Sequence, residues 1–219
     1  QQEATSMNKP TTVQALEELG RVRLSKSFFM RDFLYSEISQ IDDIPNIPDF
    51  PDRAIEAGRQ LCEQLLEPLQ DRFGRIAIRS AYRSAAVNAK GAEDGNNCAK
   101  NESNYAAHIW DYPDADGHLG ATACIVVPAL LPWYDQTSDW TPLAWWIHEN
   151  LPYANQYWFP KLAAFNLRWS ANPQVLPSIN TYVTNPHTGD KKALVHKGVA
   201  TLGLQERKSI VEPWLSSLG

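Results

Sequence analysis

The stretch from His108 to Pro128, HIWDYPDADGHLGATACIVVP, carries side chains of the types that bind metal ions. Four of them are candidate ligands: His108, His118, Cys124 and Asp116. Imidazole and thiolate suit Zn²⁺, and three protein ligands leave a fourth position open for water. A zinc ion held in this way would activate that water for hydrolysis, provided that a carboxylate, Asp111 or Asp116, reached the site to move its proton.

The same residues also have structural interpretations, which stay open at this point. His108 could cap the following loop beside Trp110 and Asp111. Cys124 stands in the apolar run ATACIVV, which predicts a buried strand, and free cysteines are commonly buried. The run D-Y-P-D-A-D-G lacks the ligand spacing of a Ca²⁺-binding loop and instead predicts a solvated turn.

The elements on either side of this stretch would position these groups. Apolar residues recur at helical spacing from Asp52 to Phe73, and Pro68 should bend or end the last turn of that helix. Gly74 then breaks the helix before FGRIAIRS, which alternates like a short strand. A second short helix is predicted from Ser84 to Lys90, and a polar loop leads from it to His108.

The second half of the chain mixes helix and strand patterns. The run LAWWIHENL predicts a helix, and residues 153–169 predict two strands separated by Phe159 and Pro160. The last stretch, LQERKSIVEPWLSSLG, predicts a terminal helix. Because strands and helices are mixed without regular βαβ alternation, we expect an α+β fold.

The order of these elements and the run Ser80-Ala81-Tyr82-Arg83-Ser84 resemble a known family. The run is similar to the S-G-Y-R-S of the M15-type zinc D,D-peptidases, which have a hedgehog-like fold and include phage and bacterial peptidoglycan peptidases. The resemblance covers about residues 24–172 and implies a small antiparallel sheet with helices packed on one face. It also implies one domain over residues 1–219, in which residues 173–219 are a C-terminal extension.

The resemblance implies a place for the first two zinc ligands. In the family, a His and an Asp of the motif S-x-H-x-x-G-x-A-x-D bind zinc together with a later His of a W-x-H stretch. His108 matches the first ligand, and the glycine of the motif falls on Gly120. Cys124 then stands where the family has Asp, and residues 109–119 are an insertion.

The later family positions fall on ENLPYANQYWFPKLAAFNLRWS. Asn166 stands in place of the last His, and Phe159 or Pro160 stands in place of the Glu that serves as the base. The family's peptide-binding residues fall on Ser80, Tyr82 and Arg83. An arginine at the end of this strand is also what a pocket for a terminal carboxylate requires.

Two functions of different class follow. The favoured one is a catalytically degenerate M15-like domain that keeps a cleft for a cell-wall peptide or a protein partner and needs no metal. The alternative is a divergent zinc-dependent peptidoglycan carboxypeptidase or endopeptidase. It would use His108, Cys124 and a third ligand, either His118 or Asp116.

The composition narrows the partners further. The net charge is −5 and no basic run is present, which argues against nucleic acid because phosphate binding needs a concentrated basic face. The longest mostly apolar run, residues 119–134, is too short and too broken by proline to cross a bilayer. The three cysteines, Cys62, Cys98 and Cys124, are an odd number without C-x-x-C spacing, which argues against a disulfide framework and against a zinc ribbon. The first ten residues lack a signal-peptide pattern, and the compartment stays open.

Overall fold

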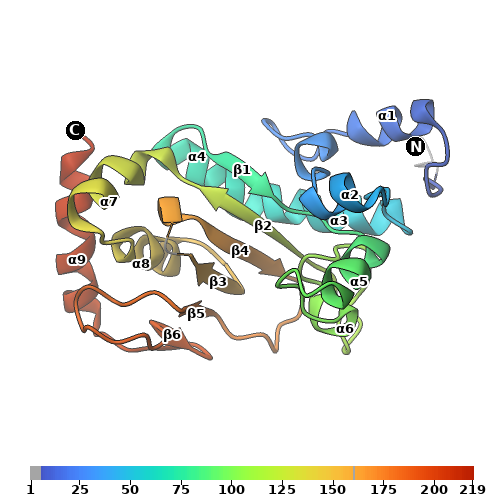
Figure 1. Cartoon of the computed structure of the whole chain (residues 1–219). Helices are drawn as coiled ribbons and strands as arrows, with labels where there is room; N and C mark the ends of the chain where they lie inside the picture. Colours follow the sequence, from blue (N-terminus) through green and yellow to red (C-terminus); the bar gives the residue numbers. More distant parts are fainter. Residues whose placement is uncertain (1–5, 160) are drawn as a thin grey trace.

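A mixed β-sheet is the frame of the fold, with helices packed around it (Figure 1). The computed structural model describes residues 6–159 and 161–219. In these residues seven strands form one sheet in the order β1-β2-β4-β3-β5-β6-β7. They are β1 (Ala77–Ser80), β2 (Gly120–Val126), β3 (Asn155–Trp158), β4 (Phe165–Ser170), β5 (Ser178–Thr181), β6 (Val195–His196) and β7 (Val199–Ala200). The predicted α+β class is confirmed.

The helices lie along one side and at both ends of this sheet. They are α1 (Val13–Gly20), α2 (Glu37–Asp42), α3 (Pro51–Leu61), α4 (Glu67–Phe73), α5 (Ala85–Glu93), α6 (Asn101–Asn104), α7 (Leu131–Thr137), α8 (Thr141–Asn150) and α9 (Leu204–Ser217). Figure 1 shows α8 and α9 at one end of the sheet and α5 and α6 at the other. The helices predicted near α5, α8 and α9 are confirmed. No helix among the described residues is long and apolar enough to span a bilayer.

The sheet is larger than the small antiparallel one that the resemblance implies, and it contains a parallel pair. Strands β3 and β5 run parallel, with Asn155 opposite Ser178. Strand β4 is antiparallel to β3, so the end of β4 lies beside the start of β3. Residues 171–177 then pass around the start of β3 and lead into β5 on its other side. The segment 173–219 therefore extends the central sheet through β5, β6 and β7 instead of decorating it.

The long helix predicted from Asp52 to Phe73 is present but changes its pitch in the middle. Helix α3 passes into a π-helical turn, Cys62–Leu66, before α4 begins. The backbone N–H of Glu67 donates to the carbonyl of Cys62, five residues earlier. Pro68 follows in the first turn of α4, where its missing N–H is tolerated. Pro68 therefore does not end the helix.

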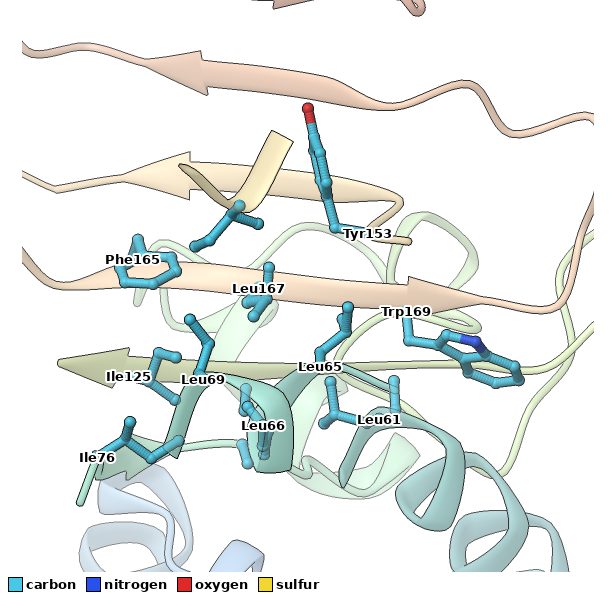
Figure 2. Packing of buried hydrophobic residues seen from close by; sticks show 14 of the residues in the cluster. Leu61, Leu65, Leu66, Leu69, Ile76, Ile125, Tyr153, Phe165, Leu167 and Trp169 are labelled. Carbon is cyan, nitrogen blue, oxygen red and sulfur yellow. The ribbon is translucent and has the colours of Figure 1, made fainter. Parts of the chain in front are cut away.

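One face of this long helix packs on the sheet to form the core. Figure 2 shows its leucines against side chains of β2 and β4. The buried residues in this contact are Leu61, Leu65, Leu66, Leu69, Ile125, Phe165, Leu167 and Trp169. Because each strand alternates its side chains between two faces, the apolar residues of β4 occupy the core face. Its polar residues are left for the opposite face.

Candidate functional site

The polar face of the sheet is the floor of a groove of about 620 Å³. Two rows of residues that pair across four or five neighbouring strands line it. The first row is Thr122, Arg168, Asn155 and Ser178. The second row is Ser80, Cys124, Asn166, Tyr157 and Asn180. We call this site the sheet groove; His108 and Arg83 also line it.

A tight turn after α6 presents His108 to the sheet groove. The backbone N–H of Ile109 donates to the carbonyl of Asn104, 3.0 Å away, and Ala106 takes a left-handed conformation with φ of 55°. The backbone N–H of Thr122 donates to the carbonyl of Ala107 at 2.9 Å, which ties the turn to β2. The turn therefore holds His108 beside the first row of the groove.

The protonation of His108 follows from its surroundings. Its Nδ1 lies 3.2 Å from the carbonyl oxygen of Ala81, and a carbonyl can only accept, so Nδ1 carries the proton and Nε2 is the acceptor. Burial lowers the pKa of His108 to about 4, and the charges of Arg83 and Arg168 lower it as well. At neutral pH the imidazole is therefore uncharged.

The same turn fixes Arg168. Its Nε donates to the carbonyl oxygen of Ala106 at 2.8 Å. That carbonyl also approaches Gly120 so closely that a Cβ there would lie 2.1 Å from the oxygen. Only glycine allows this approach, so Gly120, which the resemblance places on the motif's glycine, sets the position of the turn.

Cys124 is the second residue of the second row and is protonated at neutral pH. It pairs with Ser80 on one side and Asn166 on the other. Burial raises the pKa of its thiol to about 11, with Arg79 lowering it and Glu37 raising it. A thiol in this state is a weak nucleophile, because the thiolate is the reactive form.

The three predicted peptide-binding residues take different places. Ser80 and Arg83 line the sheet groove, and the Arg83 guanidinium contacts the Sγ of Cys98. Tyr82 instead points into the core, where it is 1 % exposed. Its hydroxyl donates to the carboxylate of the buried Asp111 at 2.9 Å. The aromatic ring is buried with Trp110, so the side chain of Tyr82 holds the insertion and does not face the groove.

The other two predicted metal ligands, Asp116 and His118, lie in the turn that precedes β2. The carboxylate of Asp114 accepts hydrogen bonds from the backbone N–H groups of both residues at 2.9 Å. The amide of Asn172 donates to Asp114 and to Asp116. His118 stands six residues before Cys124, about 20 Å at the rise of an extended strand. The structure therefore brings His108 and Cys124 together in one groove but leaves these two residues outside it.

The side chains of the sheet groove do not fit a three-ligand zinc site. His108 and Cys124 are the zinc-type donors that line it. Nowhere in residues 6–159 and 161–219 do three or more His, Cys, Asp or Glu side chains gather closely enough to hold a metal ion. Phe159 and Asn166, which the resemblance places at the Glu and His positions of the family, line the groove; Pro160, the other candidate for the Glu position, lies outside the described residues.

The charge of the sheet groove is positive. Arg83 and Arg168 line it, and no Asp or Glu is among its described lining residues. Neither arginine forms an ion pair with a described carboxylate. Glu37 lines two smaller neighbouring cavities that share Ser80 with the groove, and its side chain is exposed there.

Much of the polar lining of the sheet groove comes from four floor residues: Arg168, Asn155, Asn166 and Asn180. Of these, only Asn166 was predicted to belong to the site. The alternation in FNLRWS, with Phe, Leu and Trp buried between Asn, Arg and Ser, is the signal that could have found Arg168. Asn155 and Asn180 face the groove through the pairing of β3 with β5, which local patterns do not reveal.

Comparisons with known proteins gave no relative: no protein-family model matches the chain, and neither a curated protein nor a solved structure does.

Proposed function

We propose that this protein is an M15-peptidase-like domain that binds peptides in the sheet groove and has lost zinc-dependent hydrolysis. The proposed ligand is a cell-wall peptide. The observation that carries the proposal is the two-row floor, in which nine polar or half-buried side chains from five strands line one groove.

The spacing of the rows suits an extended peptide. Neighbouring rows stand two residues apart along each strand, about 7 Å, which is also the repeat of alternate residues in an extended chain. Asn155, Asn166 and Asn180 each offer an amide that can donate and accept, as a peptide backbone requires. No side-chain hydrogen bond joins Asn166 or Asn180 to another described residue, so these two amides are available to a ligand.

The metal-binding side chains of the groove support the loss of hydrolysis. Zinc peptidases need three ligands and a carboxylate that moves the proton of the bound water. The groove offers His108 and a protonated Cys124, with an amide at Asn166 and no lining carboxylate. An amide oxygen is a weak zinc ligand next to imidazole or thiolate.

Binding to purified muropeptides, measured by titration calorimetry, tests the proposal. We expect binding by the unaltered protein, at least fivefold weaker binding by Asn166→Ala, and unchanged binding by Asn150→Ala. Asn150 is exposed at the end of α8, away from the groove, so it is a matched control. Absence of muropeptide binding would reject the cell-wall ligand and leave a protein partner as the candidate.

Zinc content by elemental mass spectrometry tests the second half of the proposal. We expect no stoichiometric zinc after incubation with the metal and dialysis. About one zinc per chain, lost in Cys124→Ser, together with cleavage of the muropeptides, would establish the peptidase instead.

A further inference from the structure

Arg168 is a cation of the sheet groove that forms no ion pair with a described carboxylate; Asp114 acts on it only at longer range. Its Nε is bound to the carbonyl of Ala106, while no hydrogen bond from its two terminal nitrogens to a described residue is present. Burial lowers the pKa of Arg168 and outweighs the charge of Asp114, which raises it, so the guanidinium has lost part of its hydration. A partly desolvated charge without a partner costs free energy, and an anionic ligand would recover that free energy.

The guanidinium is held in place by the backbone. Ala106, whose carbonyl accepts from Arg168, has the positive φ of 55° that non-glycine residues rarely adopt. Strained residues of this kind persist where the surrounding structure fixes them, and they concentrate at functional sites. Here Gly120 and the turn around His108 fix Ala106, so the position of Arg168 is set before any ligand arrives.

A second cation stands nearby. Arg83 and Arg168 both lower the pKa of His108, so both act on the same point of the groove. Thr122 and Asn155 flank Arg168 in the first row and add a hydroxyl and an amide. Two guanidiniums without an ion pair, with neutral hydrogen-bonding neighbours, form a site that matches a carboxylate, because the guanidinium fork binds its two oxygens together.

We infer that the sheet groove selects ligands that carry a carboxylate and that Arg168 is the residue that binds it. The inference rests on the proposed function and names the chemical class of its ligand. The fixed positive charge of this site is the guanidinium of Arg168, which stands on β4 two residues after Asn166.

Three synthetic peptides test the inference, with binding followed by calorimetry. They are N-acetyl-D-alanyl-D-alanine, its C-terminal amide, and an N-acetyl dipeptide amide whose only carboxylate is a glutamate side chain. We expect the amide to bind about tenfold or more weakly than the free acid, the loss typical of a charge-assisted hydrogen bond. The third peptide distinguishes a terminal carboxylate from a side-chain one.

Variants assign the selectivity to Arg168. Arg168→Gln, in which Arg83 remains, should lose most of the preference for the acid, and Arg168→Lys, which keeps the charge but not the fork, should lose less of it. Arg75→Gln removes the same charge at an exposed position outside the groove and should behave like the unaltered protein. Equal binding of acid and amide by the unaltered protein, or undiminished selectivity in Arg168→Gln, would overturn the inference.

A separate titration keeps the inference distinct from the proposed function. If none of the peptides binds, the proposed peptide ligand fails. The carboxylate site is then tested with sodium acetate, by following the Nε–H signals of the arginines in NMR spectra. A saturable shift of the Arg168 signal, without one at Arg75, would support the site, whereas no saturable shift would refute it.

Discussion

Replacing Gly120 by alanine should disrupt the turn that holds both His108 and Arg168. The new Cβ would lie 2.1 Å from the carbonyl oxygen of Ala106 and 2.9 Å from that of Trp169. Cβ atoms essentially never approach another atom closer than 3.0 Å, so the Ala106 carbonyl must move by at least 0.9 Å, the difference between 3.0 and 2.1 Å. Both obstacles are backbone atoms, which cannot move aside by rotating a side chain.

The expected cost follows from this displacement. Overpacking in a closely packed region costs about 1–3 kcal/mol, and a clash with backbone belongs at the upper end. Alanine also reduces the freedom of the unfolded chain, which offsets about 0.4–1 kcal/mol. We therefore expect Gly120→Ala to lower the free energy of unfolding by about 2 kcal/mol, measured by urea denaturation.

A control variant and the pKa of His108 distinguish displacement of the turn from a general loss of stability. Gly117→Ala, in the insertion three residues before Gly120, has a positive φ of 85° but no atom within 4 Å of its new Cβ, so it should lose only about 1 kcal/mol from backbone strain. In Gly120→Ala the displaced turn should expose His108, and its pKa, followed by NMR, should rise from about 4 toward the ordinary value. Unchanged stability together with an unchanged pKa of His108 would refute the role given to Gly120.

Three further predictions concern the core and the groove. His108 has a pKa of about 4 in the folded protein, below the ordinary 6.5, so between these pH values the unfolded chain binds one more proton than the folded one. The free energy of unfolding should therefore fall by up to roughly 3 kcal/mol as the pH drops from 6.5 to 4. His108→Gln should flatten this pH dependence in urea denaturation, and an equal slope in the variant would contradict the pKa given to His108. Tyr82→Phe removes a donor from the buried Asp111 and should cost about 1–3 kcal/mol in thermal unfolding, whereas Tyr35→Phe at an exposed position should change little. Leu65→Ala leaves a cavity between the long helix and the sheet and should lower the free energy of unfolding by about 2–5 kcal/mol. Leu204 is 47 % exposed, so Leu204→Ala should lower it by about 0.5 kcal/mol or less. Equal losses in the two variants would show that the helix does not form the core.

Local sequence patterns predicted the elements of this fold better than their arrangement. The helical spacing after Asp52 and the strand pattern ATACIVV both correspond to elements of the structure. The parallel pairing of β3 with β5 could not be predicted, because it depends on contacts between segments distant in the chain. The π-helical turn before Pro68 could not be predicted either, since one proline is compatible with either a bend or a widened turn.

The residues of the candidate site could also be predicted only in part, because local patterns do not show which segments of the chain meet in space. His108 and Cys124 were identified by residue type, and the structure places both in the sheet groove. Arg168 was not identified, because an arginine in an alternating strand is ordinary until the neighbouring carboxylates are known. Tyr82 was assigned to peptide binding by resemblance, but the aromatic packing against Trp110 buries it.

The parallel strand β5 has a consequence for the order in which the protein is made. Strand β5 supplies Ser178 and Asn180 to the floor, and it leaves the ribosome after β1, β2, β3 and β4. Until it docks, β3 is an edge strand whose backbone N–H and C=O groups are open to pairing with other chains. The floor of the groove is therefore completed late in synthesis, and β5 at once completes it and covers the open edge of β3.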